Sequence, residues 1–383
     1  PAPCPEMQDS DLFAFNVEWY DTVAEMSRPY LLKYYEADGT VEMFDLKNRR
    51  TFLKRMVCEG ISLKDLFIGS VVTVYSRQLK IVDYADKRTA TALGSKMERT
   101  FAMIKPDAYE KTGKILALIQ ANGFSIANLK QCKLSLADAQ AFYGVHKAQP
   151  FYNDLCKFMS SDVVTALELV GNGAIQGWRK LLGPTSSFTA RSEAPNSIRG
   201  LFGTDNTKNA AHGSDSSENA QIEIGFFFGP GSRLTSRATY DNCSLCVIKP
   251  HAIIDGNAGK IIDDILEDGF EISALQMFHL NRAMAEEFLE VYKGVLPEYN
   301  AMVEHLLTGP VMALEVRAEN CATAFRELAG PSDPEIARAL RPQTLRAKYG
   351  ADKVKNAVHC TDLPEDGVLE VEYFFKILNA AAN

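Results

Sequence analysis

Hydrophobic and polar residues alternate along the first part of the chain. In "YLLKYYEADGTVEMFDL" at 30–46 the alternation has a period of two and centres on Asp38-Gly39, a pair that is typical of a β-hairpin turn. The segment "SLKDLFIGSVVTVYSRQLKIVDYAD" at 62–86 adds further short strands of the same kind. The pattern therefore predicts a small β-rich domain over residues 9–96.

From residue 97 onward, apolar runs of strand length alternate with segments of helical period. In residues 97–228 the predicted order is strand, helix, strand, helices, strand, helix and strand, over 99–105, 113–123, 125–134, 136–159, 163–170, 174–183 and 222–228. The last segment, "IEIGFFF", is predicted as a closing strand, although its Glu223 also falls in a predicted final helical region. The pattern predicts a domain that mixes helices and strands.

One set of residues occurs twice at unchanged spacing. The segments 101–130 and 245–276 match each other, and downstream the two copies carry Arg199, Asn209, His212, Asp215 and Glu223, then Arg346, Asn356, His359, Asp362 and Glu370. Each copy also has an arginine followed four residues later by Gly-Pro and a hydroxyl residue, namely Arg179 with Thr185 and Arg326 with Ser332. Self-similarity over a domain length indicates duplication. We therefore predict a first repeat at 97–228, a Gly/Ser linker at 229–238 and a second repeat at 239–379.

Composition and charge narrow the possible classes of protein. The chain has 383 residues, of which 46% are hydrophobic and 23% charged, as in ordinary globular domains. Its formal charge of −8 disfavours general nucleic-acid binding, and no run reaches the roughly 18 apolar residues of a membrane span. The first residues do not show the basic segment followed by an apolar segment that is typical of a secretory signal peptide. We therefore expect a cytoplasmic protein whose cysteines are free thiols. Cys243 and Cys246 lie on a predicted strand, where packing is favoured over metal or redox work.

The repeated residue types suit phosphate chemistry. No Gly-x4-Gly-Lys-Ser/Thr sequence is present, so side chains and not a P-loop would hold phosphate. A neutral imidazole is nucleophilic near pH 7, which makes His212 and His359 candidates to carry a phosphoryl group. Arginine forks are well suited to the transferring oxygens. The sequence thus predicts two phosphotransfer sites.

These residues resemble the nucleoside diphosphate kinase family over about 280 residues. The resemblance rests on Ile-Lys-Pro after the first strand of each repeat and on Arg-x9-Asn-x2-His-x-Ser-Asp, which the first repeat matches from Arg199 to Asp215. It implies an α+β protein with two ferredoxin-like sandwich domains and transfer of the γ-phosphate from a nucleoside triphosphate to a nucleoside diphosphate. By resemblance, the catalytic residues are His212 and His359 as nucleophiles with Glu223 and Glu370 orienting them. Mg²⁺ would arrive with the nucleotide, without a dedicated metal-ligand cluster in the protein.

The resemblance also assigns nucleotide contacts. The expected binding residues are Lys105, Tyr143, Phe151, Arg179, Thr185, Arg199 and Asn209 in the first repeat, and Lys249, Arg326, Ser332, Arg346 and Asn356 in the second. In the second repeat Glu290 is predicted at the position of Tyr143 and Glu298 at that of Phe151, where a phosphate contact and a base-stacking ring belong. The first repeat is therefore expected to be the more active one. We also expect the two copies to pack on each other.

The leading domain resembles the DM-ten (doublet-microtubule) domain, which has a pleckstrin-homology-like fold. A domain of this kind before two kinase repeats is similar to the member of the family that is associated with cilia and flagella. The resemblance implies axonemal microtubule proteins, including tubulin, as partners and a cilium or flagellum as location. Five basic residues after the predicted hairpin are Lys47, Arg49, Arg50, Lys54 and Arg55. The sequence alone favours a solvated turn with scattered salt bridges as much as a contact with acidic tubulin, and only the resemblance favours the contact. The alternative function is a mainly structural microtubule protein with weak or vestigial kinase activity.

Overall fold

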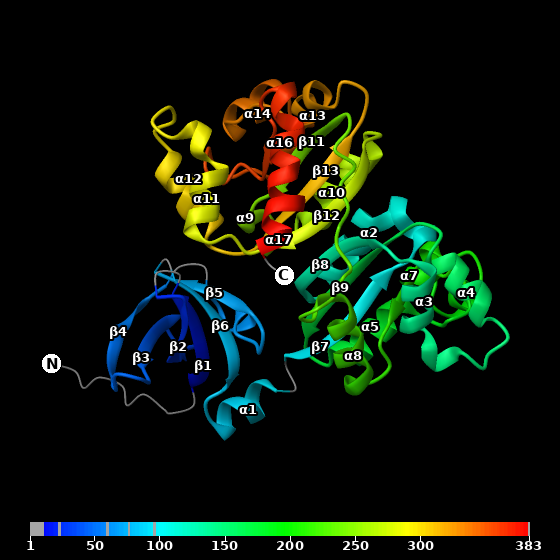
Figure 1. Ribbon diagram of the computed structural model, residues 1–383, viewed down its shortest axis with the longest axis horizontal. Coiled ribbons are helices and arrows are strands. Elements are labelled where there is room, and N and C mark those ends of the chain that lie inside the picture. Colours follow the sequence, from blue (N-terminus) through cyan, green and yellow to red (C-terminus); the bar gives the residue numbers. More distant parts are fainter. Residues whose placement is uncertain (1–10, 22–23, 59–60, 76, 95–96, 382–383) are drawn as a thin grey trace.

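The chain folds into three units that lie against one another (Figure 1). The computed structural model describes residues 11–21, 24–58, 61–75, 77–94 and 97–381. The predicted ends of the leading domain, at residues 9 and 96, lie outside these described residues. In Figure 1 the leading domain is blue, the first repeat runs from cyan to green, and the second repeat runs from green to red.

The leading domain is a six-stranded antiparallel sheet with one helix at its end. Its strand order is β4-β3-β2-β1-β6-β5. The predicted hairpin is confirmed, since β2 pairs with β3 from Tyr35 and Thr40 outward and Gly39 takes a φ of 65°, which favours glycine. The elements are β1 Leu12–Asp21, β2 Met26–Tyr35, β3 Thr40–Asp45, β4 Arg50–Val57, β5 Val71–Val74, β6 Arg77–Tyr84 and α1 Lys87–Leu93.

The first repeat has the ferredoxin-like strand order β10-β7-β9-β8, with antiparallel neighbours. Its elements are β7 Glu98–Ile104, α2 Thr112–Ala121, β8 Ser125–Lys133, α3 Leu136–Phe142, α4 Tyr152–Met159, β9 Val163–Gly171, α5 Ala174–Leu182, α6 Ser187–Glu193, α7 Ile198–Phe202, β10 Ala211–Gly213 and α8 Ser217–Phe228.

The closing strand predicted at 222–228 is wrong, because this segment belongs to helix α8. Ser216 caps the helix by accepting a hydrogen bond from the backbone N–H of Asn219. Buried Ile224 and Phe227 are three residues apart, whereas Ile222 is 69% exposed, as the helical period requires. The fourth strand is instead the three-residue β10 at Ala211–Gly213. The helical alternative for Glu223 is the one that the structure adopts.

The second repeat has the same strand order, β14-β11-β13-β12. A π-helical stretch over Tyr373–Leu378 joins its last two helices. The elements are β11 Cys243–Ile248, α9 Pro250–Ile254, α10 Ala258–Glu267, β12 Glu271–Phe278, α11 Arg282–Phe288, α12 Tyr299–Leu306, β13 Val311–Arg317, α13 Cys321–Ala329, α14 Pro334–Leu340, α15 Leu345–Tyr349, β14 Val358–Cys360, α16 Gly367–Glu372 and α17 Asn379–Ala381.

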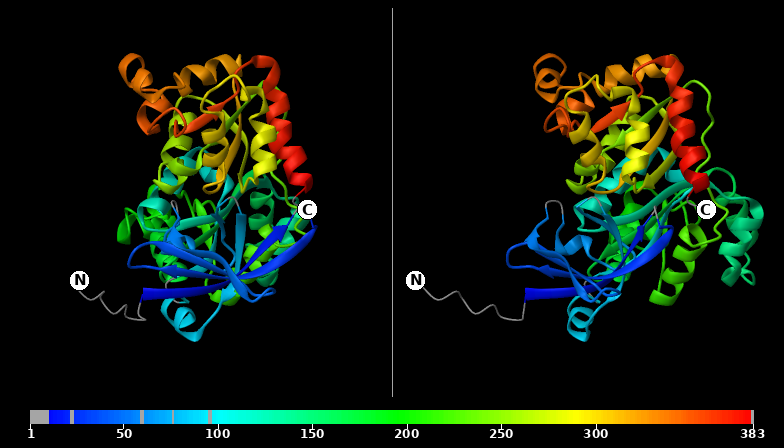
Figure 2. Two further views of the ribbon diagram at one scale, coloured as in Figure 1. Left: turned by 90° about the vertical axis from the view of Figure 1, so that its left-hand side faces the viewer. Right: turned by 60° about the vertical axis from the view of Figure 1, so that its left-hand side comes forward.

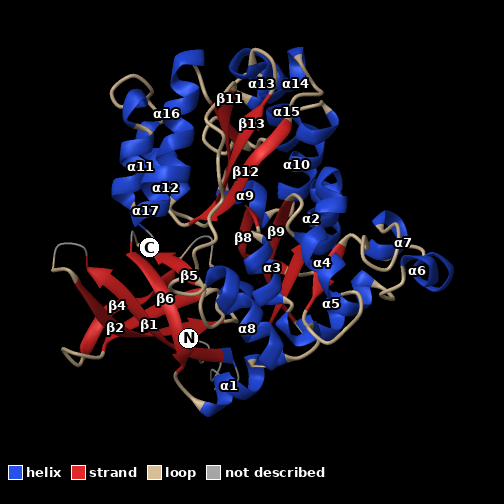
Figure 3. Cartoon of the chain, turned by 45° about the vertical axis from the view of Figure 1, so that its right-hand side comes forward, coloured by secondary structure: helices blue, strands red, loops and turns tan. Residues whose placement is uncertain are grey.

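The two repeats share one eight-stranded sheet, because β8 of the first pairs with β12 of the second (Figure 3). Helices α2 and α10 pack across the same junction at short range. A Cβ on Gly113 would lie 2.2 Å from the backbone nitrogen of Asp263, and one on Gly259 would lie 2.2 Å from that of Ala117. Only glycine permits this approach. The expectation that the copies pack on each other is confirmed.

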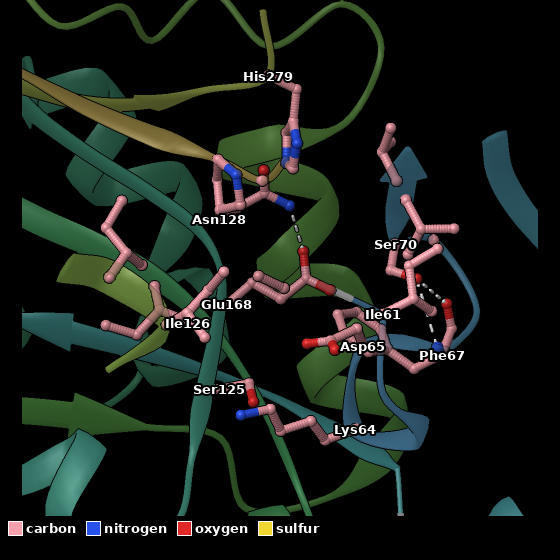
Figure 4. Close-up of a pocket in the computed structure, with 18 of the residues that line it drawn as sticks. Ile61, Lys64, Asp65, Phe67, Ser70, Ser125, Ile126, Asn128, Glu168 and His279 are labelled. Atoms are coloured by element: carbon pink, nitrogen blue, oxygen red, sulfur yellow. Dashed lines mark hydrogen bonds between the residues drawn. The ribbon is translucent and has the colours of Figure 1, made fainter. Parts of the chain in front are cut away.

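The leading domain contacts both repeats (Figure 2). The side-chain amide of Gln78 donates to the backbone oxygen of Leu280 in the second repeat. A cavity of about 490 Å³ lies where the three units meet, lined from all of them. In its wall the buried Glu168 accepts a hydrogen bond from Asn128 at 2.7 Å, and the ring of His279 points into the space (Figure 4). This cavity is separate from both candidate histidines.

Candidate functional site

His212 lies on β10, where the short edge strand meets the start of helix α8. Its Nε2 is 2.9 Å from Oε1 of Glu223, and the other carboxylate oxygen of Glu223 accepts a hydrogen bond of 2.5 Å from Ser214 Oγ. A carboxylate only accepts, so we assign the ring proton to Nε2. The lone pair of the neutral imidazole is then on Nδ1. The arrangement fixes both the tautomer and the orientation of the ring.

Aromatic rings hold the imidazole from several sides. The ring centroid of His212 lies 5.5 Å from that of Phe142, 6.0 Å from Phe101 and 6.0 Å from Tyr143. The indole N–H of Trp178 donates to the backbone oxygen of His212 at 3.1 Å. These contacts make the position of the imidazole rigid, which a nucleophile requires.

A buried lysine and a partly buried arginine lie beside this histidine. Lys105 Nζ donates to Asn209 Oδ1 at 2.7 Å and to the backbone oxygen of Thr207 at 3.0 Å. Burial lowers the pKa of Lys105 to about 8, helped by the nearby guanidinium of Arg199. Burial also lowers the pKa of Arg199 to about 10. Grouping cations in a buried site is costly, and an anion placed among them would offset the cost.

Some donors around His212 have no partner in the described part of the chain. The hydroxyl of Tyr143 and the Nε–H of Arg199 are both buried and unbonded. Burial raises the pKa of Tyr143. Buried donors without partners are rare in folded proteins and are frequent where a ligand supplies the acceptor. Here the missing acceptor would be a phosphate oxygen.

The remaining predicted residues of the first repeat form an exposed rim. A series of ring contacts leads from Tyr143 through His146 to Phe151, which is 48% exposed at the start of α4. Arg179 is exposed in the last turn of α5, and Thr185 follows that helix and accepts a hydrogen bond from Asn209 at its backbone oxygen. All the residues predicted for the first repeat therefore belong to one face of one domain.

The second repeat builds the same centre around His359. Its Nε2 is 3.0 Å from Glu370 Oε2, and that oxygen also accepts a hydrogen bond of 2.8 Å from Thr361. The side chain of His359 is only 9% exposed, against 21% for His212. A cavity of about 580 Å³ is lined by the predicted binding residues Lys249, Arg326, Ser332, Arg346 and Asn356 together with His359.

The prediction for Glu290 is wrong, because Leu289 occupies the position of Tyr143. Tyr143 and Leu289 each directly follow the helix that carries the ring packed on the histidine, and both are buried. Glu290 is exposed and does not line the cavity. Glu298 does stand at the position of Phe151, as the residue that precedes α12. The second repeat therefore has no hydroxyl at the position of Tyr143 and no ring at the position of Phe151.

The cavity of the second repeat contains an internal ion pair. Arg326 donates to Asp362 Oδ1 at 2.5 Å, and the hydroxyl of Tyr292 donates to Asp362 Oδ2 at 2.5 Å. We call this set the Asp362 bridge. In the first repeat the matching carboxylate of Asp215 instead accepts from Asn219 at 2.6 Å. Arg326 thus already pairs with an anion, whereas in the described part of the chain Arg179 forms no ion pair.

A histidine pair replaces a carboxylate beside Lys249. Asp107 accepts the backbone N–H of Ala210 in the first repeat, and His251 Nε2 accepts that of Ala357 in the second. His251 also lies 2.9 Å from His305. Burial lowers the pKa of His251 to about 4, so the pair is neutral at pH 7. Burial also lowers the pKa of Lys249, to about 7, with the Arg346 guanidinium adding to the shift and Asp352 opposing it.

Several of these residues were not singled out from the sequence. Phe142 and Phe288 hold the two histidine rings, and Tyr292 completes the Asp362 bridge. The sequence repeat could have identified the two phenylalanines, because Phe142 recurs as Phe288. Tyr292 had no such signal, since His146 stands at its position in the first repeat.

Within the described ranges, no group of three or more His, Cys, Asp or Glu side chains could hold a metal ion. Over the same part of the chain, no helix has the length and apolar character needed to cross a membrane.

Comparison with known proteins agrees with this geometry. The family model "Nucleoside diphosphate kinase" matches residues 98–232 and 242–379, and "Nucleoside diphosphate kinase 7 N-terminal PH domain" matches residues 7–95. The chain is 54% identical to nucleoside diphosphate kinase homolog 7 of Rattus norvegicus over 97% of this chain and 94% of that protein. It is 52% identical to the homolog 7 of Mus musculus over 99% and 96%. A nucleoside diphosphate kinase of Geobacter sp. (strain M21) is 50% identical over 34% of this chain and 96% of its own length. The expected family, its member with a leading domain and the pleckstrin-homology-like fold of that domain are confirmed.

Proposed function

Because this chain belongs to the nucleoside diphosphate kinase family, we propose that its first repeat transfers the γ-phosphate of a nucleoside triphosphate to a nucleoside diphosphate by way of phosphorylated His212. The observation that carries the proposal is the bond between His212 Nε2 and Glu223. It leaves the Nδ1 lone pair as the nucleophile.

In the first half-reaction, Nδ1 of His212 bonds to the γ-phosphorus while the bond from that phosphorus to the bridging oxygen breaks. The nucleoside diphosphate leaves with the electron pair of that bond. The Nε2 proton stays between the ring and Glu223, whose carboxylate stabilises the positive charge that the ring gains. In the second half-reaction, a terminal oxygen of another nucleoside diphosphate attacks the phosphorus and neutral His212 is regenerated.

The surrounding donors stabilise the transferring group. Lys105 uses two of its three protons within the protein, and Arg199 Nε and the hydroxyl of Tyr143 use none of theirs. We assign these groups to the oxygens of the transferred phosphate, where fixed donors contribute most. Exposed Phe151 is assigned to stacking on the base, a contact that tolerates every base.

Magnesium is the cofactor that members of this family generally use with the nucleotide. The residues fit an ion held by the nucleotide phosphates, since the buried groups around His212 are donors and Asp215 is the exposed carboxylate near it. Mg²⁺ keeps several waters in such sites and neutralises phosphate charge.

A phosphoenzyme measurement tests this function directly. Incubating the whole chain with γ-labelled triphosphate should give an acid-labile, base-stable phosphohistidine, and peptide mapping should place it on His212. The matched variant Glu223→Gln keeps the size of the side chain but removes its charge, so it should slow formation of the phosphoenzyme. Label on serine or threonine alone would contradict the proposal.

A second candidate function is docking on axonemal microtubules, in a cilium or flagellum, through the leading domain. The observation that favours it is an exposed basic patch at the β3–β4 turn and on edge strand β4, made of Lys47, Arg49, Arg50 and Lys54. Arg55, the fifth predicted member, pairs with Asp38 at 2.5 Å and lies over the ring of Tyr35, so we leave it out of the patch. A basic patch attracts the acidic surface of tubulin.

Co-sedimentation with microtubules tests this candidate. Neutralising the four residues of the basic patch to glutamine should weaken binding and make it less sensitive to salt. The matched control neutralises four exposed lysines of the repeats, Lys133, Lys157, Lys180 and Lys260. Equal binding by the two variants would remove the basic patch from the function.

A further inference from the structure

Two cysteines of the second repeat lie directly opposite each other on neighbouring strands. Cys246 of β11 and Cys360 of β14 are register partners in an antiparallel pair. The adjacent pair is hydrogen-bonded, since the N–H of Thr361 donates to the backbone oxygen of Leu245 at 3.2 Å. Antiparallel strands alternate between bonded and non-bonded pairs, so the two cysteines form a non-bonded pair with Cα atoms about 4.5 Å apart.

This placement meets the covalent geometry of a disulfide. Disulfides join residues whose Cα atoms are about 4.4–6.8 Å apart and whose Cβ atoms point to the same side. Both side chains are buried in the same core cluster, on one face of the sheet. Both thiols are free in this structure.

Cys360 is the thiol that a small oxidant can reach. It lines the cavity of the second repeat, whereas Cys246 does not. A guanidinium N–H of Arg346 donates to its sulfur at 3.5 Å. Burial raises the pKa of Cys360, and Arg346 opposes that rise by stabilising the thiolate. Burial raises the pKa of Cys246 as well, with Cys360 adding to the shift. We therefore expect the reaction to be slow and to start at Cys360.

We propose that Cys246 and Cys360 are a reversible redox pair that a peroxide converts into a cross-strand disulfide beside the second cavity. The thiolate of Cys360 attacks one oxygen of hydrogen peroxide, the O–O bond breaks, and a sulfenic acid and water result. The sulfur of Cys246 then attacks the sulfur of Cys360, and the sulfenic oxygen leaves as a second water. Two thiols lose two electrons in total and one peroxide gains them.

The first repeat cannot make this bond. The same register positions there hold Ala102 and Gly213. A Cβ on Gly213 would lie 2.4 Å from the ring of Trp178, so even a cysteine could not be accommodated without a shift. Oxidation would therefore act on one repeat and leave the other unchanged.

The disulfide would change the phosphate-binding face of the second cavity. Drawing the sulfur of Cys360 toward Cys246 removes one acceptor from Arg346, which keeps its backbone acceptors at Gly330 and Val358. It would also fix the three-residue edge strand β14, which carries His359, to β11. The redox state of the pair would thus set how rigidly the second site is held.

The test is to map disulfides after peroxide treatment of the whole chain. Remaining thiols are blocked under denaturing conditions, and the protein is digested without reduction for mass spectrometry. The main cross-linked product should join the peptides of Cys246 and Cys360, and it should disappear after dithiothreitol. Absence of this product, once the treated protein has lost free thiols, overturns the proposal.

Cys243 requires a control because it lies three residues from Cys246. The cross-link should survive in Cys243→Ser and be lost in Cys246→Ser, with Cys360→Ala as the second variant should Cys246→Ser fail to fold. On oxidation, the melting temperature should rise for the unaltered chain and for Cys243→Ser, and should not rise for Cys246→Ser. A cross-link to Cys360 that persists in Cys246→Ser would show that Cys243 is the partner and would overturn the assignment.

Discussion

The two repeats keep the same histidine–glutamate centre but surround it differently. In the first, the hydroxyl of Tyr143 and the Nε–H of Arg199 have no acceptor among the described residues, and Arg179 is exposed. In the second, Leu289 has no donor to offer, and Asp362 already occupies Arg326. Conserving the reacting group is therefore not the same as conserving the site. The difference lies in which donors remain available for a phosphate.

The largest expected effect separates the two histidines. His212→Ala should lower γ-phosphate exchange by at least about a hundredfold, because it removes the nucleophile. His359→Ala should change exchange by less than about twofold. Steady-state exchange rates of the two variants of the whole chain provide the measurement. A larger loss in His359→Ala would reverse our ranking of the repeats.

The next effect concerns the base. Glu298→Phe should restore a stacking ring to the second cavity and strengthen nucleotide binding there by about 1 to 3 kcal/mol, roughly 5- to 150-fold. Calorimetric titration in a Phe151→Ala background would assign the gain to the second cavity. Pyrophosphate, which has no base, is the control ligand. An equal gain for pyrophosphate would mean that removing the charge, and not stacking, is the cause.

A smaller effect should come from the Asp362 bridge. Asp362→Asn should free Arg326 and strengthen pyrophosphate binding in the second cavity by up to about 1 kcal/mol, or about fivefold, since the pair is half exposed. Tyr292→Phe removes only one of the two contacts and should give a smaller gain. Asp215→Asn is the matched change in the first repeat. A gain there as large as that of Asp362→Asn would show that the bridge is not the cause.

The smallest expected effect is one of pH. A lysine attracts phosphate only while protonated, and the free-state pKa is about 7 for Lys249 and about 8 for Lys105. Pyrophosphate affinity should therefore begin to fall near pH 7 in the second cavity and about one pH unit higher in the first. Lys249→Met and Lys105→Met should each flatten the dependence of its own site. Two identical pH profiles would contradict the difference in burial that we describe.

Much of the architecture was predictable because it follows from periodicity and repetition. The hairpin at Asp38-Gly39 and the apolar strands of the first repeat follow a local pattern of period two or a continuous apolar run. The prediction of a strand at 222–228 was wrong because three consecutive phenylalanines are compatible with either a strand or a helix. Only its contacts with the sheet decide, through burial of Ile224 and Phe227.

The composition of the sites was predictable, but their internal pairing was not. His212 and Glu223 are eleven residues apart, and their contact follows from a strand directly before a helix. The contact between Tyr292 and Asp362 joins residues 70 positions apart through packing of separate elements. The connection after α11 is one residue longer than the connection after α3, so Leu289 and not Glu290 stands at the position of Tyr143. The number of residues between the matched motifs does not reveal where this extra residue lies.

The pairing of β8 with β12 has a consequence for any attempt to divide the molecule. Each of these strands would be an outer strand of its own four-stranded sheet, and the two edges meet at the register pair of Gln276 with Lys130. Cutting between the repeats would leave both edges open to any other strand, a common origin of self-association. Separated halves would tend to stick to further copies of themselves, so their behaviour alone would describe an aggregate and not the intact chain.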